Sequence, residues 1–213
     1  MDIVVLVHGL GRTRRSMRSL ARALERSGYR VINVGHPSWR HRLPVLAARV
    51  TAKIDAAIAA SPASASGARL HFVGHSLGCL IIRWIVAHRP PPGLGRIVLL
   101  TPPNQGARAA DRLLPWLGWL VRSLPDLTVA GGVARALRTP PGVEIGIIAG
   151  TRDHTVKLHE TRLEDETARA EVPYMHSFIM AHRDVQEMVA RFLATARFSG
   201  PEPGDPEPGG PAR

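Results

Sequence analysis

The sequence has 213 residues, of which 45% are hydrophobic and 21% are charged. This length suits one well-cored domain, and the composition excludes a wholly disordered chain or a membrane-embedded one. The net charge of +11 raises the question of a nucleic-acid partner, but all but two of the 28 basic residues are arginines scattered through an Ala-, Pro- and Gly-rich chain. The densest cluster falls on exposed positions of one predicted helix: Arg12, Arg14, Arg15, Arg18 and Arg22. We therefore favour a solvated helix face over a polyanion site, and expect no nucleic-acid partner.

The amino terminus lacks the signature of a secretory leader. The apolar run at 3–7 is too short for a signal peptide, and no basic segment precedes it. No stretch reaches transmembrane length without a charge or a proline. The single cysteine, Cys79, excludes an internal disulfide and fits a reducing compartment. We expect a cytoplasmic protein in which Cys79 is a buried structural residue.

The first part of the chain alternates strands with helices. Residues 3–7 form a continuous β-branched run, typical of a parallel strand buried on both faces, and 29–34 predict the next strand. Between them Thr13 can cap a helix that Gly28 ends, and Pro44 opens a second helix. The apolar faces of these two helices consist of Met17, Leu20 and Leu24, and of Leu46, Val50, Ile54 and Ile58.

A Ser-, Ala- and Gly-rich linker at 61–68 leads to a buried strand at 69–73. A helix follows this strand, as the helical spacing of its apolar residues indicates: Leu77, Leu80, Ile81, Trp84 and Ile85. Residues 96–101 and 143–149 predict a fourth and a fifth strand, with a long excursion between them.

The last predicted elements are a short strand at 169–172 and a helix with an apolar face of Val185, Met188, Val189, Phe192 and Leu193. Strands alternating with helices at this spacing predict an α/β fold of three layers, with a mainly parallel sheet of about six strands covered by helices on both sides. We expect residues 1–198 to form this domain. The Pro- and Gly-rich tail at 199–213 has no apolar anchor and should be disordered.

Residues 74–78 read Gly-His-Ser-Leu-Gly between a predicted strand and a predicted helix. A G-x-S-x-G nucleophile elbow requires this context, because a serine at the apex of so tight a turn needs φ > 0 and small neighbours. Gly74 and Gly78 provide that room. The turn would present the hydroxyl of Ser76 at the carboxyl edge of the sheet, toward which the next helix directs its N-terminal amides. Ser76 is therefore a candidate nucleophile.

A serine hydroxyl needs a base within hydrogen-bond reach and a group that orients the base. With such an elbow, the acid and the histidine follow the serine on loops at the carboxyl ends of later strands. Asp153 comes directly after the fifth strand and is the candidate acid, with Asp111 and Asp126 as fallback acids. His176 lies between the last short strand and the final helix and is the candidate base. His182 is the alternative, but it lies where that helix begins.

The turn at 8–11, His-Gly-Leu-Gly, follows the first strand and completes the candidate site. A glycine-containing turn there lets a backbone amide face the nucleophile, so we expect the N–H groups of Leu10 and Leu77 to form an oxyanion hole. We expect the side chain of His8 to brace this loop and the ring of His75 to pack against the neighbouring turn.

Residues 107–139 form an excursion where a cap above the active-site edge would lie. The segment is rich in large apolar residues, namely Leu113, Leu114, Trp116, Leu117, Trp119, Leu120, Val121 and Leu124. Pro115 and Gly118 predict short helices instead of one long helix. Two interpretations stay open: a segment that only covers the core, or a small cap that contacts an apolar substrate or a lipid interface through 113–124.

The second interpretation names candidate substrate-binding residues. Trp116 and Trp119 would contact the apolar part of a substrate. Asn104 or Gln105, which lead into the excursion, would line the pocket. His154 and His159 have no metal-ligand spacing, so we predict no metal site.

Five parts of the sequence together resemble the α/β-hydrolase superfamily, and within it the compact bacterial lipase/esterase group: residues 7–11, 74–78, 100–106, 150–153 and 176. They occur in the family's order over nearly the whole predicted domain. The resemblance implies Ser76 as the nucleophile, His176 as base and acid, Asp153 as the orienting group, and an acyl-enzyme intermediate. It also implies that the chain begins at the family's third strand, without the usual antiparallel edge strands.

The expected function is hydrolysis of carboxylic esters, small-molecule or lipid, by an esterase or lipase that needs no cofactor. Two alternatives remain. An acyltransferase or thioesterase would use the same triad. The acyltransferase would pass the acyl group to an acceptor other than water, and the thioesterase would cleave a thioester. A non-catalytic binding protein would keep the fold alone.

Overall fold

The computed structural model describes residues 1–60 and 67–199, so nearly all of the predicted linker and tail fall outside the described residues. Its centre is a parallel sheet with strand order β2-β1-β3-β4-β5-β6. The strands are β1 (Ile3–Val7), β2 (Arg30–Val34), β3 (Leu70–His75), β4 (Leu94–Leu100), β5 (Ile145–Gly150) and β6 (Ala168–Val172). The predicted six-stranded α/β architecture is confirmed, and β2 and β6 form the two edges.

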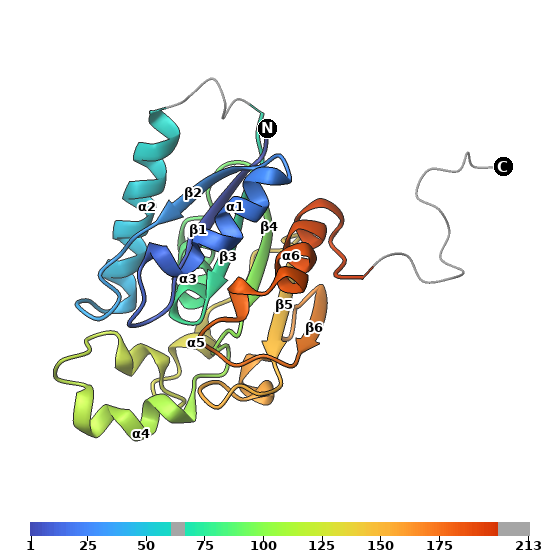
Figure 1. The fold of residues 1–213 in the computed structure, drawn as a ribbon. Coiled ribbons are helices and arrows are strands. Elements are labelled where there is room, and N and C mark those ends of the chain that lie inside the picture. Colours follow the sequence, from blue (N-terminus) through green and yellow to red (C-terminus); the bar gives the residue numbers. More distant parts are fainter. Residues whose placement is uncertain (61–66, 200–213) are drawn as a thin grey trace.

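Helices cover both faces of the sheet (Figure 1). One face carries α2 (Leu43–Ala59) and α3 (Leu77–His88), and the other carries α1 (Arg18–Arg26) and α6 (Arg183–Thr195). Strand β1 shows why both layers are needed, because Val5 packs toward one layer, Leu6 packs toward the other, and both are fully buried. Alternating side chains of a central strand point to opposite faces, so an all-apolar strand requires two apolar layers.

The first helix differs in detail from its prediction. Thr13 accepts a hydrogen bond from the N–H of Arg15, but it caps the short 3-10 helix η1 (Arg14–Met17), which then continues into α1. Gly28, just after α1, has φ +87, a left-handed conformation that glycine adopts without strain. Arg12 precedes η1 and is half-buried, unlike the exposed arginines on η1 and α1.

The excursion lies beyond the carboxyl ends of the strands (Figure 1). It contains α4 (Arg108–Leu117), η3 (Leu124–Leu127) and α5 (Val133–Ala136), short helices as expected. Pro115 lies inside α4 instead of ending it. The carboxylate of Asp126 accepts hydrogen bonds from the Arg42 guanidinium and from the N–H of Leu43, the first residue of α2. This ion pair ties the excursion to the helical layer.

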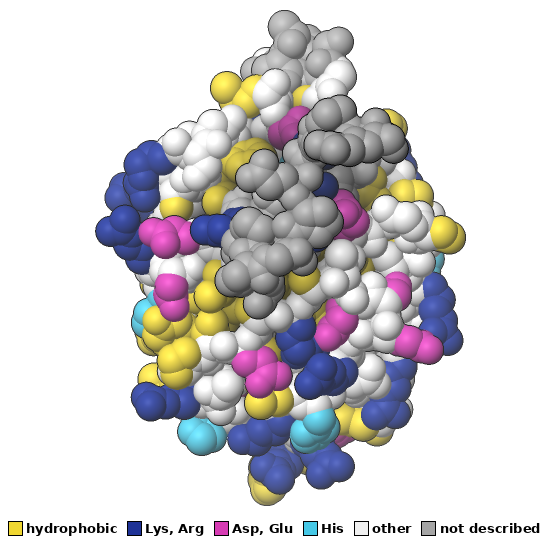
Figure 2. Space-filling view, turned by 90° about the vertical axis from the view of Figure 1, so that its right-hand side faces the viewer, with side chains coloured by type: hydrophobic (Ala, Val, Ile, Leu, Met, Phe, Trp, Pro, Cys, Tyr) yellow, Lys and Arg dark blue, Asp and Glu magenta, His cyan; other side chains and the backbone are white. Residues whose placement is uncertain are grey.

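Two further sequence expectations concern Cys79 and surface charge. The Cys79 thiol is fully buried, donates to the carbonyl of Leu100, and has its pKa raised by burial, as expected for a structural residue. On the face shown in Figure 2, basic side chains are spread among acidic and apolar ones. Within residues 1–60 and 67–199, no helix combines the length and hydropathy needed to cross a bilayer.

Candidate active site

Ser76 occupies the sharp turn between β3 and α3. Its backbone has φ 52 and ψ −119, a conformation that L-residues rarely adopt. The flanking glycines leave no room for a side chain: a Cβ on Gly78 would lie 2.2 Å from the carbonyl oxygen of Val7, and one on Gly74 would lie 2.8 Å from the amide nitrogen of Cys79. The turn therefore packs directly against β1 and α3, as an elbow of this sequence requires.

Three side chains far apart in the sequence meet at this turn. The hydroxyl oxygen of Ser76 lies 2.9 Å from Nε2 of His176, and Nδ1 of His176 lies 2.6 Å from Oδ2 of Asp153. The carboxylate can only accept, so Nδ1 carries the proton and Nε2 is free to accept the hydroxyl proton of Ser76. Hydroxyl, imidazole and carboxylate thus form one continuous hydrogen-bonded row.

Asp153 is held in place by backbone groups. Its second oxygen, Oδ1, accepts hydrogen bonds of 2.7 Å from the N–H of Thr155 and 2.9 Å from that of Val156. The side chain is almost fully buried. Because one oxygen is fixed by the loop after β5, the other is directed at His176.

The alternative acids and the alternative histidine have other partners. Asp111 accepts from the N–H groups of Val129 and Ala130, and Asp126 pairs with Arg42 as described above. His182 precedes α6 and stacks on Tyr174, with ring centroids 3.5 Å apart. None of the three makes a hydrogen bond or ion pair with Ser76 or His176 among the contacts described for the chain.

His75 contacts the loop of the candidate base, a role beyond the packing that the sequence predicted. Its Nε2–H donates a 2.8 Å hydrogen bond to the carbonyl oxygen of His176, and the two rings lie 4.9 Å apart. Burial, reinforced by the neighbouring His176, lowers the pKa of His75 to about 3. The ring is therefore neutral at ordinary pH and can accept at Nδ1, which has no partner among the described residues.

The loop after β1 lies against the elbow. A Cβ on Gly9 would lie 3.0 Å from Cβ of Ser76 and 2.9 Å from Nδ1 of His75. Within the described residues, the N–H groups of Leu10 and Leu77 have no hydrogen-bond acceptor. Two free donors beside a serine hydroxyl are the chemical requirement for stabilising an oxyanion.

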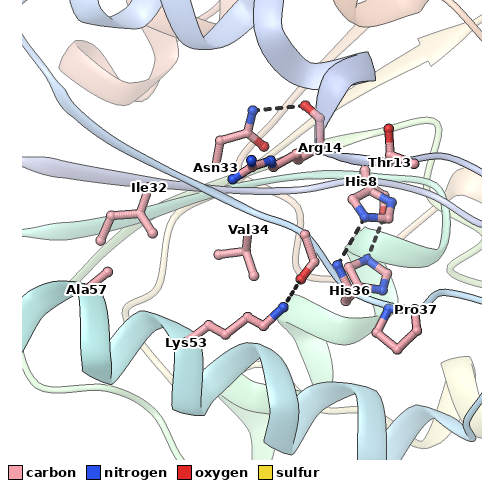
Figure 3. A pocket seen from close by; sticks show the side chains of 11 residues that line it. His8, Thr13, Arg14, Ile32, Asn33, Val34, His36, Pro37, Lys53 and Ala57 are labelled. Atoms are coloured by element: carbon pink, nitrogen blue, oxygen red, sulfur yellow. Dashed lines mark hydrogen bonds between the residues drawn. The ribbon is translucent and has the colours of Figure 1, made fainter.

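His8 braces this loop, as predicted, and does so together with His36. Its Nδ1 lies 3.0 Å from the carbonyl of Gly9, and its Nε2 accepts from the backbone N–H of His36. The His36 ring returns a hydrogen bond to the carbonyl of His8 and stacks on the His8 ring at 4.0 Å (Figure 3). The pair closes one end of a cavity of about 640 Å³ along β2, where Lys53 binds the carbonyl of Gly35 (Figure 3).

A cavity of about 230 Å³ opens beside Ser76 and His176. Much of its wall comes from small and apolar residues of the excursion: Ala107, Ala109, Ala110, Leu113, Leu124 and Leu127. Leu10, Pro103 and Val156 continue this apolar lining from other loops. The cavity can therefore accept an apolar group next to the serine hydroxyl.

The residues predicted to bind substrate do not line this cavity. Asn104 is buried, where it accepts from Arg83 and donates to the carbonyl of Thr161, and Gln105 donates to the carbonyl of Arg162. Trp116 and Trp119 are 77% and 76% exposed. The residues of α4 that line the cavity are Ala109, Ala110 and Leu113, and contact of the four predicted side chains with substrate stays a prediction.

No cluster of three or more His, Cys, Asp or Glu side chains suited to a metal ion occurs among the residues that the structure describes. A serine oxygen in hydrogen-bond contact with an imidazole can act as a nucleophile toward an acyl carbon.

A family described as "Putative serine esterase (DUF676)" matches residues 1–93. The structure of a lipase, BlEst2, from Bacillus licheniformis superimposes with a TM-score of 0.71 and 17% identity, covering 92% of each chain. The chain has an α/β-hydrolase fold. Other structures with this fold include a monoacylglycerol lipase from Paleococcus ferrophilus, with a TM-score of 0.65, 16% identity and coverage of 91% of this chain and 94% of that one.

A hydrolase from Pseudomonas aeruginosa PA01 also shares the α/β-hydrolase fold, with a TM-score of 0.60 and 18% identity over 90% of this chain and 88% of that one. No protein of curated function matches the sequence. At these identities the structural matches establish the fold, and the function depends on the site.

Several residues of this hydrolase-fold site were not predicted from the sequence. The amides of Thr155 and Val156 hold Asp153, and the Asp-x-Thr spacing is a signal for such a side-chain-to-backbone turn. Arg12 lines the cavity, although its sequence context suggested a solvated helix. No local signal marks it, because the direction of its side chain depends on the path of the loop before η1.

Proposed function

We propose that this protein is a serine hydrolase that cleaves carboxylic esters through an acyl-enzyme on Ser76. The observation that carries the proposal is the hydrogen-bonded row from Ser76 through His176 to Asp153, at 2.9 and 2.6 Å. The strained backbone of Ser76 and the family match over residues 1–93 support it. In this proposal Ser76 is the nucleophile, His176 the general base and acid, and Asp153 the group that orients the imidazole.

In the first half of the reaction, the Ser76 oxygen attacks the ester carbonyl carbon while Nε2 of His176 takes the hydroxyl proton. The carbonyl π electrons move to oxygen, and the N–H groups of Leu10 and Leu77 stabilise the resulting oxyanion, each contributing about 3 kcal/mol. When the tetrahedral intermediate collapses, the bond to the alcohol oxygen breaks. The imidazolium of His176 returns its proton to the departing alkoxide.

The second half repeats these steps with water. His176 takes a proton from water as the water oxygen attacks the acyl carbon, and the Ser76–acyl bond breaks. The proton returns to Ser76, and the carboxylic acid is released. The Asp153 carboxylate stabilises the transient imidazolium.

We further infer that residues 107–139 form a small cap within one hydrolase domain of residues 1–198. The apolar side chains of α4 and η3 that line the cavity would contact the acyl chain. The end of α4 and the following turn expose further large apolar residues, namely Trp116, Leu117, Trp119 and Leu120. Such a surface beside an active-site cavity suits transient contact with aggregated lipid substrate.

Two alternatives use the same fold and are separable by experiment. In an acyltransferase or a thioesterase, Ser76 would attack in the same way. The acyltransferase would favour an alcohol or thiol as acceptor, and the thioesterase would favour a thiol as leaving group. A binding protein would bind an ester without hydrolysing it. The free donors at Leu10 and Leu77 favour catalysis, since binding alone does not require unpaired amides beside a nucleophile.

The deciding experiment combines covalent labelling with turnover. Wild-type protein should react with a fluorophosphonate probe, with the adduct mapped to Ser76 by peptide mass spectrometry, and should hydrolyse 4-nitrophenyl butanoate. Ser76→Ala should lose both activities, whereas Ser27→Ala, an exposed serine at the end of α1, should keep both. Labelling of wild type without turnover would favour a transferase that lacks its acceptor. Absence of labelling at Ser76 would overturn the proposal.

A further inference from the structure

The cavity beside Ser76 has an uneven distribution of charge. Among its lining residues that the structure describes, Arg12 is the only lysine or arginine, and no aspartate or glutamate is present. Asp153 lies behind His176 and is almost fully buried. The cavity that would receive the substrate therefore combines an apolar wall with a single permanent positive charge.

Among the residues that the structure describes, Arg12 has no acidic partner. None of the ion pairs described for the chain includes it, and the contact of its guanidinium is with the ring of Phe178, 5.3 Å from the ring centroid. The aromatic face attracts the cation without accepting a hydrogen bond in the plane of the guanidinium, so its N–H donors can still bind an anion. The charge also contributes to the lowered pKa of His75, which places it electrically close to the elbow.

The location of Arg12 identifies the part of the substrate that it can contact. Arg12 lies two residues after Leu10, whose N–H is a proposed oxyanion donor. The backbone N–H of Arg12 donates a hydrogen bond to the carbonyl of Gly9. Phe178, whose ring the Arg12 guanidinium contacts, is two residues beyond His176. Since His176 must reach the departing oxygen to protonate it, we expect the part of the cavity near Arg12 and Phe178 to receive the leaving group. The apolar wall of α4 and η3 is left for the acyl chain.

We propose that Arg12 is a specificity residue, and that the preferred substrates are esters whose alcohol part carries a negative charge, a carboxylate or a phosphate. This inference rests on the proposed function and names its substrate class. A partly buried, unpaired guanidinium pairs with such an anion through charge-assisted, often bidentate hydrogen bonds, which are stronger than neutral ones. In the free enzyme, the Arg12 guanidinium is then already in place to form an ion pair with the anionic group of the substrate.

The test uses two substrates that differ in charge and match in acyl chain and ring. They are 4-butanoyloxybenzoate, which is anionic at neutral pH, and 4-butanoyloxybenzamide, which is neutral. The measured quantity is the ratio of kcat/KM for the anion to kcat/KM for the amide. Comparing this ratio between variants cancels the intrinsic difference in leaving-group reactivity. For a phosphate as the anionic group, the same ratio of kcat/KM is measured with 1-butanoylglycerol 3-phosphate and neutral 1-butanoylglycerol.

Arg12→Gln should lower the ratio at least about tenfold, as expected for losing one hydrogen bond between charged groups. Arg12→Lys should recover part of it, because the charge remains while the planar donor fork is lost. Added NaCl should lower the wild-type ratio and leave that of Arg12→Gln nearly constant. Arg15→Gln, which changes an exposed arginine outside the cavity, is the matched control and should keep the wild-type ratio.

Three results would overturn the inference. Equal losses on the anionic and the neutral substrate would mean that Arg12 assists catalysis or structure without selecting charge. Unchanged kcat/KM of Arg12→Gln on both substrates would mean that Arg12 does not contact the leaving group. A dependence on Arg12 only when the charge is on the acyl part, measured with 4-nitrophenyl hemiglutarate against 4-nitrophenyl pentanoate, would place the anion on the wrong side. Retained turnover in Ser76→Ala would instead refute the proposed function, whatever these ratios are.

Discussion

The side chain of His75 donates a hydrogen bond of 2.8 Å to the backbone carbonyl of His176. The elbow that presents the candidate nucleophile thus also holds the loop that presents the candidate base. His75 contacts the carbonyl of His176, and the adjacent residue Ser76 contacts the His176 ring. The Ser76–His176 distance therefore depends on His75 as well as on the two residues themselves. A shift of about 1 Å at such a site can cost about a hundredfold in rate.

Replacing His75 should therefore lower kcat with little change in KM. We expect His75→Ala to lose about tenfold to a hundredfold in kcat, and His75→Gln, which can still donate to the carbonyl, to lose less. Since the pKa of His75 is about 3, the ring is neutral across the working range, so the pH at which activity rises should not move in either variant. A shifted pH profile would show that His75 acts as a base itself.

Asp153→Asn should reduce kcat by about 10³- to 10⁴-fold, the size of effect found for this change in Ser-His-Asp enzymes. The reason lies in the two N–H groups of Thr155 and Val156, which will select the amide oxygen and turn the NH₂ group toward His176. Nδ1 must then accept, so Nε2 carries the proton and cannot take one from Ser76. Steady-state hydrolysis of 4-nitrophenyl butanoate measures the loss.

Asp111→Asn is the control for this substitution, because Asp111 binds only backbone amides within the excursion. It should keep most of the wild-type kcat. If Asp153→Asn retained activity while Asp111→Asn did not, the orienting carboxylate would be misassigned.

Gly9→Ala should impair catalysis without unfolding the protein. The added methyl group would lie 2.9 Å from Nδ1 of His75 and 3.0 Å from Cβ of Ser76, so the loop carrying the Leu10 amide must move. Losing one oxyanion donor costs about 10²- to 10³-fold in kcat. Gly35→Ala, whose methyl would meet the Arg14 side chain at an ordinary 3.7 Å, is the matched control and should be active. Equal activity of the two variants would exclude the loop from the site.

Stability should fall as pH drops below about 6.5, in part because of His36. Burial, with smaller contributions from His8 and Lys53, lowers its pKa to about 4 in the folded state. Between these values the unfolded chain binds more protons than the folded one, so unfolding becomes easier as pH falls and the effect levels off near pH 4. The shift corresponds to about 3 kcal/mol in total.

Urea unfolding at several pH values between 7 and 4.5 measures this slope. His36→Gln, which can still donate to the carbonyl of His8, should show a shallower decline than wild type. Parallel curves for the two proteins would mean that His36 does not carry the pH dependence.

The exposed tryptophans of α4 and the following turn should matter only for aggregated substrate. Replacing Trp116 and Trp119 together by Ala should lower hydrolysis of an emulsified triacylglycerol several-fold and leave hydrolysis of monomeric 4-nitrophenyl butanoate within about twofold, because neither side chain reaches the cavity. Binding to lipid vesicles, followed by tryptophan emission, should weaken in the same variant. Equal losses on both substrates would contradict an interfacial role.

The fold could be predicted from the sequence because strands such as β1 and β5 are apolar runs followed by glycine-containing turns, and helical apolar patterns lie between the strands. The strand limits were less certain, as β4 shows. It begins at Leu94, earlier than predicted, and Gly95 there leaves room for the ring of His71, whose Nδ1 accepts from the N–H of Arg96 at an irregularity in the β3–β4 pairing. Such a contact depends on tertiary placement and has no local pattern.

The candidate site was predictable where chemistry constrains the chain order, as with Ser76, Asp153 and His176, which the structure brings into hydrogen-bond contact. It was not predictable where only orientation matters. Trp116 was expected in the pocket because tryptophan suits apolar ligands, but the cavity is lined by Ala109, Ala110 and Leu113, and Trp116, three residues farther along α4, is exposed. Where along a helix a cavity ends is decided by the segments that pack against the helix.

The bond between Asp126 and the amino end of α2 sets a limit on how substrates can enter. Swinging the apolar wall aside would strip a carboxylate that is only 2% exposed of its arginine and leave the Leu43 amide without its acceptor. We therefore expect the wall to stay in place, and the cavity to keep its depth, when a ligand binds. A frame of constant depth predicts an abrupt decline in turnover beyond one acyl length, instead of gradual tolerance of longer chains.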